Sequence, residues 1–480
     1  MKRNLTMLTD LYQMTMLYGY FSEGIQSKEV VFDLFFRKNS GTSAYAIFAG
    51  LEQMIDYVNH LRFEAEDLAY LDSLQLFDAK FLEWLRAFRF MGEIYAMPEG
   101  SVVFPNEPLV RVHAQLGEAQ LLETAMLNII NHQTLIATKA SRVVHAAGEG
   151  EVLEFGLRRA QGPDAGIYGA RAAVIGGCIA TSNVMAGQSF GLPVRGTHAH
   201  SWVMSFPDEL TAFRAYAAHF PDACMLLVDT YDTLQSGVPN AITVFKELRT
   251  AGHVPAGIRL DSGDLAYLSK NARAMLDEAG FPEVKIFASN DLDETLIRDL
   301  RLQGARIDTW GVGTKLITGG KHPALGGVYK LAAESDGQRM QPRMKLSDTR
   351  EKMSNPGIKK VIRFYDKRTD KAIADLVALE GERFDESRPL RIYHPDSPWL
   401  SKVIDHFYAR DLLVPIFVQG KQVYESKPVM ALREYTISQL DTFWEEYKRD
   451  LNPSVYKVDL SDALYDLKNA LIDELVKKDG

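Results

Sequence analysis

The pattern of hydrophobic and polar positions divides the chain near residue 150. Before that point, apolar residues at helical spacing over 4–22 and 115–135 are mixed with strand-like runs at 29–37 and 95–112. Pro-Glu-Gly and Pro-Asn-Glu-Pro turns interrupt the last run, as is typical of short antiparallel strands. The first third therefore predicts an α+β domain.

A different rhythm follows, in which a short apolar run, a polar loop and a helix repeat at roughly 20–30 residues, the size of a βα unit. The predicted strands lie at 151–157, 194–200, 224–228, 257–260, 284–288 and 306–310. A doubly wound open sheet fits this rhythm but gathers its ligands near one switch point. We favour an irregular (β/α) barrel, because polar residues follow every one of these strands and a barrel brings all such loops to one face.

The βα rhythm stops at about residue 335. Strand-like runs at 372–379 and 412–418 can return to complete the first domain's sheet, and the end of the chain has the pattern of charged, amphipathic helices. We predict an α+β domain from residues 1–140 and 336–440, a barrel with the active site at 141–335, and a helical extension at 441–480.

Composition narrows the class of protein. With 480 residues the chain exceeds one ordinary core, which favours two domains. A net charge of −9 without a long basic run disfavours a nucleic-acid partner. The two cysteines, Cys178 and Cys224, lie in apolar runs and are expected to be buried thiols of a reducing compartment. No uncharged signal-peptide core or membrane-length apolar run is present, so we expect a cytoplasmic protein without a membrane partner.

Residues 196–206 hold two histidines, His198 and His200, between a Gly-Thr turn signal and an apolar run. In an extended run the two imidazoles would point to the same side. Such a pair suits metal ligation, acid–base chemistry or attack on a phosphoryl group, and equally a structural hydrogen-bonded pair. No glutamate or cysteine partner lies nearby, so we predict no structural metal site, although a metal-dependent hydrolase remains an alternative.

Other strand ends carry groups suited to anions and sugars. Arg158 and Arg159 offer planar guanidinium forks for a carboxylate or phosphate, or for a surface ion pair. Asp261 follows Arg259 at a strand end and suits a ribose hydroxyl or a metal-bound diphosphate, whereas helix capping alone would explain Ser262 and Asp264. The Gly-Val-Gly-Thr run at 311–314 resembles a phosphate cradle.

Taken together, the motifs of the chain resemble the nicotinate phosphoribosyltransferase family of type II phosphoribosyltransferases. The resemblance covers nearly the whole sequence and is carried, in order, by TDLYQMTM, FDLFFRKN, EFGLRRAQGPDAG, GTHAHSWVMSF, VDTYDT, RLDSGDL, ASNDLDE, WGVGTKL and a late KLS…K.S.PG.K segment. It implies a sandwich-like α+β domain on an irregular (β/α) barrel, in a homodimer with shared active sites. It also implies a reaction that joins nicotinate to 5-phosphoribosyl 1-diphosphate, with Mg²⁺, giving nicotinate mononucleotide and diphosphate in NAD biosynthesis.

The same resemblance implies roles for particular residues. ATP hydrolysis would be coupled through phosphorylation of His200, with Arg259 and Asp261 holding the ribosyl diphosphate. The substrate-binding set would be Tyr12 (from the partner subunit) and Phe155 around the pyridine ring, Arg158 at the carboxylate or a phosphate, Asn290 at the ribose, Gly311, Gly313 and Thr314 at the 5′-phosphate, and Ser182, Thr197 and Asp229 beside them. Related nicotinamide enzymes place an aspartate where this chain has Ser182, which favours the acid as acceptor.

Alternatives remain open at this point. They are the same chemistry on nicotinamide or quinolinate, and a non-catalytic barrel that binds a phosphosugar. The basic stretch 345–360, in which Lys345, Lys352, Lys359 and Lys360 flank a Pro-Gly turn, is a candidate for closing over a nucleotide or is a solvated loop.

Overall fold

The structure is a computed structural model, and it describes residues 4–39, 43–347, 353–394 and 397–479. The chain forms two units. Unit 1 consists of residues 1–135, 324–427 and 434–480, and unit 2 of residues 136–323 and 428–433. We describe each unit by itself.

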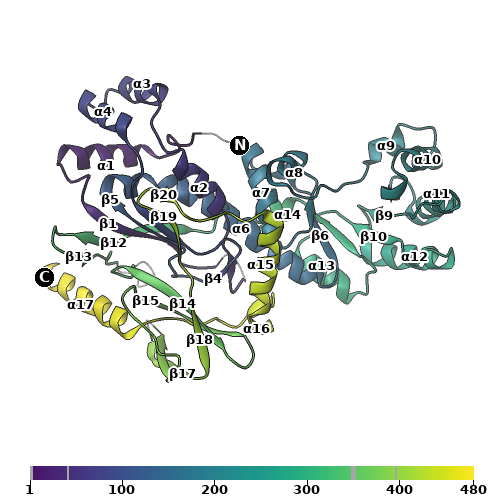
Figure 1. Cartoon of the computed structure of the whole chain (residues 1–480). Coiled ribbons are helices and arrows are strands. Elements are labelled where there is room, and N and C mark those ends of the chain that lie inside the picture. The colour runs from purple at the N-terminus through teal and green to yellow at the C-terminus, as the bar shows by residue number, and fades with distance from the viewer. Residues whose placement is uncertain (1–3, 40–42, 348–352, 395–396, 480) are drawn as a thin grey trace. The chain divides into compact units, whose positions relative to one another are not determined.

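Two antiparallel-rich sheets form the framework of unit 1 (Figure 1). Among the described residues, the first has seven strands in the order β13-β12-β1-β5-β3-β19-β20: β1 (Glu29–Phe36), β3 (Glu93–Ala96), β5 (Val110–Gln115), β12 (Gly327–Ser335), β13 (Met340–Pro342), β19 (Val414–Val418) and β20 (Lys421–Gln422). Every residue of β1 after Glu29 is buried, which explains its nearly continuous apolar sequence. The late run 412–418 thus completes this sheet as predicted.

The second sheet runs β17-β16-β21-β15-β14-β18, with β14 (Lys359–Asp366), β15 (Ala372–Leu379), β16 (Leu390–His394), β17 (Ser397–Ile404), β18 (Phe407–Asp411) and β21 (Val458–Leu460); a small pair joins β2 (Ala46–Ile47) to β4 (Val102–Val103). The run 372–379, expected in the first sheet, therefore lies in a separate one. The C-terminal segment, expected to be helical, also contributes strand β21.

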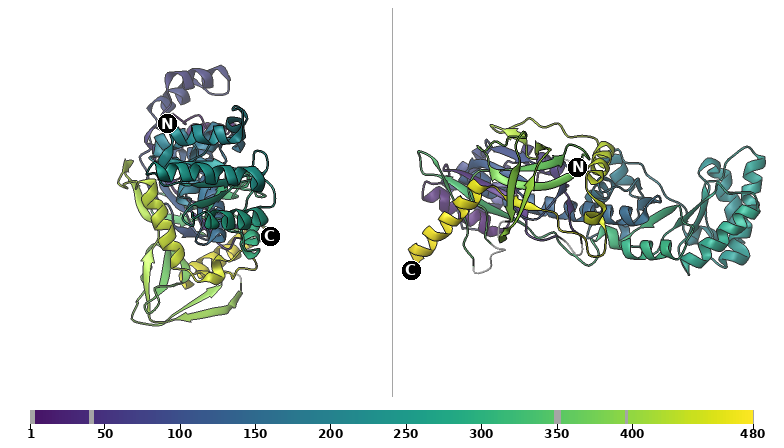
Figure 2. Two further views of the ribbon diagram at one scale, coloured as in Figure 1. Left: turned by 90° about the vertical axis from the view of Figure 1, so that its right-hand side faces the viewer. Right: turned by 90° about the horizontal axis from the view of Figure 1, so that it is seen from below.

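The helices of unit 1 are α1 (Leu11–Ser22), α2 (Leu51–Asn59), α3 (Ala65–Ser73), α4 (Ala79–Ala87), α5 (Leu116–Leu121), α16 (Glu445–Lys448) and α17 (Asp462–Asp479), together with parts of α6 (Glu123–Ala147) and α15 (Val429–Asp441), which continue into unit 2. The main core gathers apolar side chains from β1, β5 and α1–α6. The last helix, α17, contacts β15 and is the yellow helix at the C-terminal end in Figures 1 and 2.

Unit 2 is built on a parallel sheet with the strand order β7-β6-β11-β10-β9-β8. Its strands are β6 (Glu151–Glu154), β7 (Ala180–Thr181), β8 (Met225–Leu227), β9 (Gly257–Leu260), β10 (Lys285–Ala288) and β11 (Thr309–Val312). Its helical elements are η1 (Leu157–Arg159), α7 (Pro163–Ile175), α8 (Val184–Phe190), α9 (His200–Met204), α10 (Glu209–His219), η2 (Pro221–Ala223), η3 (Thr233–Gly237), α11 (Val238–Thr250), α12 (Leu265–Glu278), α13 (Glu294–Leu302) and α14 (Thr314–Ile317). Figures 1 and 2 show its teal helices lying beside these strands.

The predicted barrel is confirmed only as a parallel α/β sheet. The six strands follow the order they would have around a barrel, but within the described ranges no ladder joins β7 to β8, so the sheet is open there. The two-residue β7, which the sequence pattern did not reveal, pairs with β6 and makes an isolated bridge from Thr181 to Val194. The break falls where the chain runs through the histidine stretch between β7 and β8.

In the described part of the chain, no helix has the length and apolar character needed to cross a membrane.

Candidate active site at the strand ends of unit 2

The predicted site residues of unit 2 lie mostly at one edge of its sheet. Parallel strands present all their carboxyl ends at the same edge, so the loops that follow them are neighbours. Phe155 follows β6, Ser182 follows β7, Asp229 lies just after β8, Asp261 follows β9, Asn290 lies after β10 and Gly313 follows β11.

Arg259 is the centre of a hydrogen-bond network at this edge. Its guanidinium group donates to Asp261 Oδ1, Thr197 Oγ1 and Ser289 Oγ, each at 2.9 Å. Ser289 in turn donates to Asp261. The Arg259 side chain is only 15% exposed, so water screens these interactions weakly. The network fixes a cation and a carboxylate side by side and joins the histidine stretch to β9 and β10.

Asp229 supplies a second carboxylate. Its Oδ2 accepts the backbone N–H of Asp261 at 2.8 Å and the hydroxyl of Ser262 at 2.7 Å. Its Oδ1 is buried and has no hydrogen-bond partner among the described residues. Ser262 therefore supports Asp229, whereas Asp264 caps α12 through Tyr267 N–H as expected.

The strand expected at 194–200 does not form, because only Val194 makes an isolated bridge and His200 already begins helix α9. The Nε2 of His200 lies 3.7 Å from Asp261 Oδ2 and 4.0 Å from Asp229 Oδ1, and its Nδ1 lies 3.2 Å from Thr230 Oγ1. With 39% of the side chain exposed, the imidazole can reach a ligand from solvent. The histidine thus faces two carboxylates, and sequence reasoning missed its contact with Thr230, although Thr230 follows a strand.

His198 has a structural role. It is 8% exposed, and its Nε2 accepts the backbone N–H of Leu227 at 3.2 Å, which anchors the histidine stretch to β8. Burial lowers the pKa of His198 to about 4, in agreement with a neutral ring that accepts a hydrogen bond. Its ring also packs edge-on against Tyr216.

Phe155 lies between the cationic network and the glycine loop. Its ring is 5.4 Å from that of Phe287, and the Arg259 guanidinium carbon lies 5.7 Å from its centroid. Gly311, expected at a phosphate, lies inside β11, where an added Cβ would be 2.6 Å from Phe287 and 3.1 Å from Phe155. A Cβ on Gly313 would come within 3.3 Å of the Phe155 carbonyl oxygen. Gly311 therefore lets β11 pack closely on these aromatic rings, and Gly313 lets the following loop approach the backbone of Phe155.

The loop after β10 is strained. Asn290 and Asp291 have φ values of 99° and 25°, a region that residues other than glycine seldom adopt. Such strain persists only where the surroundings impose it, and it is frequent at functional sites. This favours a role for Asn290, which the resemblance assigns to the ribose.

Three predicted residues remain. Arg158 is exposed in η1, Thr314 is half-buried and begins α14, and Tyr12 lies on α1 of unit 1 with 49% of its surface exposed.

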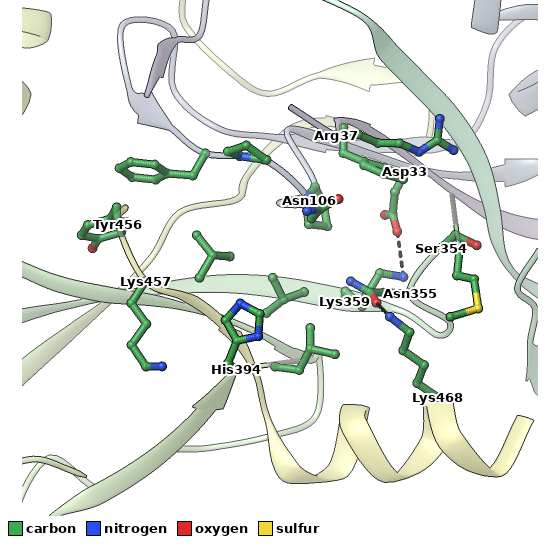
Figure 3. Close-up of a pocket in the computed structure, with 18 of the residues that line it drawn as sticks. Asp33, Arg37, Asn106, Ser354, Asn355, Lys359, His394, Tyr456, Lys457 and Lys468 are labelled. Carbon is green, nitrogen blue, oxygen red and sulfur yellow. Dashed lines mark hydrogen bonds and ion pairs between the residues drawn. The ribbon is translucent and has the colours of Figure 1, made fainter. Parts of the chain in front are cut away.

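A cavity of about 580 Å³ lies in unit 1, and its lining includes none of the predicted site residues (Figure 3). Figure 3 shows Asp33 directed at Lys359 and Lys468 directed at Asn355, and these contacts measure 2.7 and 3.0 Å. Lys359, part of the stretch considered for nucleotide closure, is thus buried and ion-paired. Lys352 of the same stretch lies outside the described residues.

Comparison with known proteins gives the family. Models of the nicotinate phosphoribosyltransferase (NAPRTase) N-terminal domain, family and C-terminal domain match residues 7–131, 151–333 and 358–468. The chain is 49% identical over 472 residues to nicotinate phosphoribosyltransferase of Bacillus subtilis (strain 168), covering 98% of this chain and 96% of the relative. It is 41% identical to nicotinate phosphoribosyltransferase pncB2 of Mycobacterium tuberculosis (strain ATCC 25618 / H37Rv), over 92% of this chain and 88% of the relative.

Solved structures agree. The crystal structure of human nicotinic acid phosphoribosyltransferase matches with a TM-score of 0.85 and 32% identity, covering 96% of this chain and 99% of the human chain. A parallel α/β sheet with arginine, carboxylate and histidine groups at its strand ends is an arrangement typical of enzymes that handle phosphorylated substrates. This chain belongs to the nicotinate phosphoribosyltransferase family.

Proposed function

We propose that this protein joins nicotinate to 5-phosphoribosyl 1-diphosphate and releases nicotinate mononucleotide and diphosphate, a step of NAD biosynthesis. Family membership over the whole chain supports this activity. The structural observation that carries it is the convergence of Arg259, Asp261 and His200 at one sheet edge. We expect the reaction to take place in the cytoplasm.

The chemistry explains why these groups suffice. The pyridine nitrogen is a weak nucleophile, so the C1′–oxygen bond to diphosphate must be largely broken before the C1′–nitrogen bond forms. Positive charge then develops on the ribose and negative charge on the leaving diphosphate. The carboxylates of Asp229 and Asp261 would stabilise the ribose, and Arg259 would neutralise the diphosphate. Asn290 would hold the ribose, and Gly313 and Thr314, with Gly311 behind them, the 5′-phosphate.

Phe155 would stack on one face of the pyridine ring, and Tyr12 of a second subunit would cover the other. The exposure of Tyr12 in unit 1 leaves its ring available for this contact. Arg158 would bind the nicotinate carboxylate with its planar fork. Ser182 is neutral and does not repel that carboxylate, which favours nicotinate over nicotinamide. These roles imply a homodimer with shared sites.

His200 would couple ATP hydrolysis to this reaction. If Nδ1–H donates to Thr230, the lone pair of Nε2 is free to attack the γ-phosphorus, with ADP leaving and a phosphohistidine forming. The phosphoryl group would then lie beside Asp229 and Asp261, and its charge would alter how the diphosphate binds. Water would later hydrolyse the phosphohistidine.

The two carboxylates also fit Mg²⁺. Asp229 Oδ1 has no hydrogen-bond partner in the described chain, and Asp261 Oδ2 faces the same histidine nitrogen. Mg²⁺ is usually held by one or two carboxylates together with substrate phosphates, and when bound it would neutralise the diphosphate. No group of three or more His, Cys, Asp or Glu side chains that could hold a metal ion is present in the described ranges.

An acceptor screen tests the proposal. Purified protein is incubated with phosphoribosyl diphosphate and nicotinate, nicotinamide or quinolinate, with and without ATP, and diphosphate release is measured. Nicotinate should be the preferred acceptor and ATP should stimulate the reaction. A preference for nicotinamide would show that Ser182 does not select the acid over the amide. No release with any acceptor would favour a barrel that only binds a phosphosugar.

A further inference from the structure

Glu154 is a buried carboxylate at the end of β6 that the mechanism above does not use. Its side chain is fully buried and accepts the backbone N–H of Gly156 and, at 2.6 Å, the hydroxyl of Thr181. Its carbonyl oxygen accepts the backbone N–H of Ser182 at 3.0 Å. One residue therefore joins the loop after β6 to the loop after β7.

The partners of Glu154 extend this connection. Thr181 Oγ1 accepts the N–H of Asn183 at 3.0 Å, and the Asn183 side chain caps α8 and donates to the carbonyl of Gly166. At Gly156 an added Cβ would lie 2.5 Å from Ile317 and 2.8 Å from the Gly313 carbonyl oxygen, so this backbone packs directly on the last residue of α14 and on the residue that precedes the helix. The carboxylate thus fixes a turn that touches a third strand-end loop.

A buried carboxylate is a costly way to hold two loops. Burial raises the pKa of Glu154, while the bonds from Thr181 and Gly156 oppose that rise. Apolar residues would fill the same space without this cost, but they would not fix the direction of two donors. The cost is consistent with a requirement for a defined geometry.

The two bonded loops carry the acceptor side of the site. Phe155 lies between Glu154 and Gly156, and Ser182 directly follows Thr181. The groups proposed to hold the diphosphate have other partners, because Arg259 is fixed by Thr197 and Ser289, and Asp261 by Asp229. On the phosphate side, the Glu154 turn packs on Gly313. We propose that Glu154 is a positioning residue for the pyridine acceptor, setting the distance between Phe155 and Ser182; this rests on the proposed function of these two residues.

The test uses the single variants Glu154→Gln and Thr181→Val and the double variant that combines them. The control is the single variant Glu151→Gln. In Glu154→Gln the amide oxygen can still accept the Gly156 N–H, but the amide nitrogen then faces the Thr181 hydroxyl, whose proton loses its acceptor. Glu151 stands at the other end of the same strand, so its variant is a matched control. Thr181→Ser keeps the hydroxyl and should rescue.

We expect each single variant to raise the KM for nicotinate by about 10-fold, and the double variant to add little, because both remove one shared bond. The KM for phosphoribosyl diphosphate should change by less than about twofold, as expected for interactions that do not touch that substrate. Glu151→Gln and Thr181→Ser should behave like the wild type. The melting temperature of every variant is measured together with its kinetic constants.

The positioning role is overturned if nicotinate KM is unchanged, or if both KM values rise together with a fall in melting temperature. If Glu154→Gln does not fold, the comparison of Thr181→Val with Thr181→Ser decides the question alone. If the wild type and Glu151→Gln release no diphosphate with nicotinate, the proposed function has failed, which is a separate result.

Discussion

The buried ion pair between Arg363 on β14 and Asp375 on β15 makes a quantitative prediction for unit 1. Both side chains are fully buried, and Arg363 donates to the two carboxylate oxygens at 2.8 and 2.6 Å. Tyr456 donates to Asp375 Oδ1 at 3.0 Å. The perturbation is Asp375→Asn, which keeps the volume of the side chain and removes its charge.

The expected loss follows from the geometry. Arg363 would keep its bond to the Val102 carbonyl oxygen, but its charge would lose the carboxylate with which it forms two hydrogen bonds. Removing one member of a buried ion pair costs about 3–5 kcal/mol. Exchange of the amide hydrogens in β14 and β15 should therefore accelerate by roughly two to three and a half orders of magnitude.

Glu107→Gln is the matched control. Glu107 is also buried beside Asp375, and burial, followed by the charge of Asp375, holds its pKa well above the usual range. Because the pKa of the folded state is raised, the contribution of Glu107 to stability is present at low pH and is lost as pH rises through that pKa. The amide variant should fold at neutral pH and remove this pH dependence.

Hydrogen–deuterium exchange with peptide resolution is the measurement, with peptides of β9 in unit 2 as an internal reference. A loss below about 1 kcal/mol for Asp375→Asn would refute the reasoning, because surface pairs already reach that value. So would a Glu107→Gln variant as unstable as Asp375→Asn.

Three further outcomes are expected. His200→Ala should abolish ATP stimulation and labelling by the γ-phosphate while diphosphate release without ATP persists; retained labelling would assign the phosphoryl group to another residue. For His198, whose folded pKa of about 4 lies below the unfolded value, stability present above about pH 6.5 should decline as pH falls from there to about 4, by up to about 3 kcal/mol; acid titration of unfolding free energy checks this, and His198→Gln should flatten the profile. Gly311→Ala should displace the rings of Phe155 and Phe287, cost about 1–3 kcal/mol and raise the nicotinate KM; unchanged thermal unfolding and KM would contradict the close packing.

Local features of the fold could be predicted from the sequence. The strands that end at Glu154, Leu260 and Ala288 have the predicted apolar runs. The helix beginning at Glu209 has Asp208 as its cap, a role that aspartate favours at a helix start. These features can be predicted because hydrophobic spacing and capping depend on residues within one turn or strand. The two-residue β7 escaped notice because it is too short to show a period.

The sequence also predicted part of the candidate site. Arg259 and Asp261 were found because they end a strand, and their hydrogen bond agrees with that reasoning. Thr230 and Ser289 also follow strands, but a hydroxyl beside a strand carries little signal by itself. Glu154 was passed over because a glutamate in a strand is ordinarily exposed.

The sequence by itself determined five of the six strands of the parallel sheet, the helix caps and the chemical groups available at the strand ends, because each of these depends on neighbours along the chain. Only the tertiary structure decided which of two nearly adjacent histidines is buried, where the parallel sheet stays open, and that Glu154 joins two loops. These properties depend on burial and on partners far away in sequence: His198 meets Leu227, and Glu154 meets Thr181. In the folded protein, residues of the same type differ in pKa and in hydrogen bonding, because desolvation and hydrogen-bond partners differ from one position to the next.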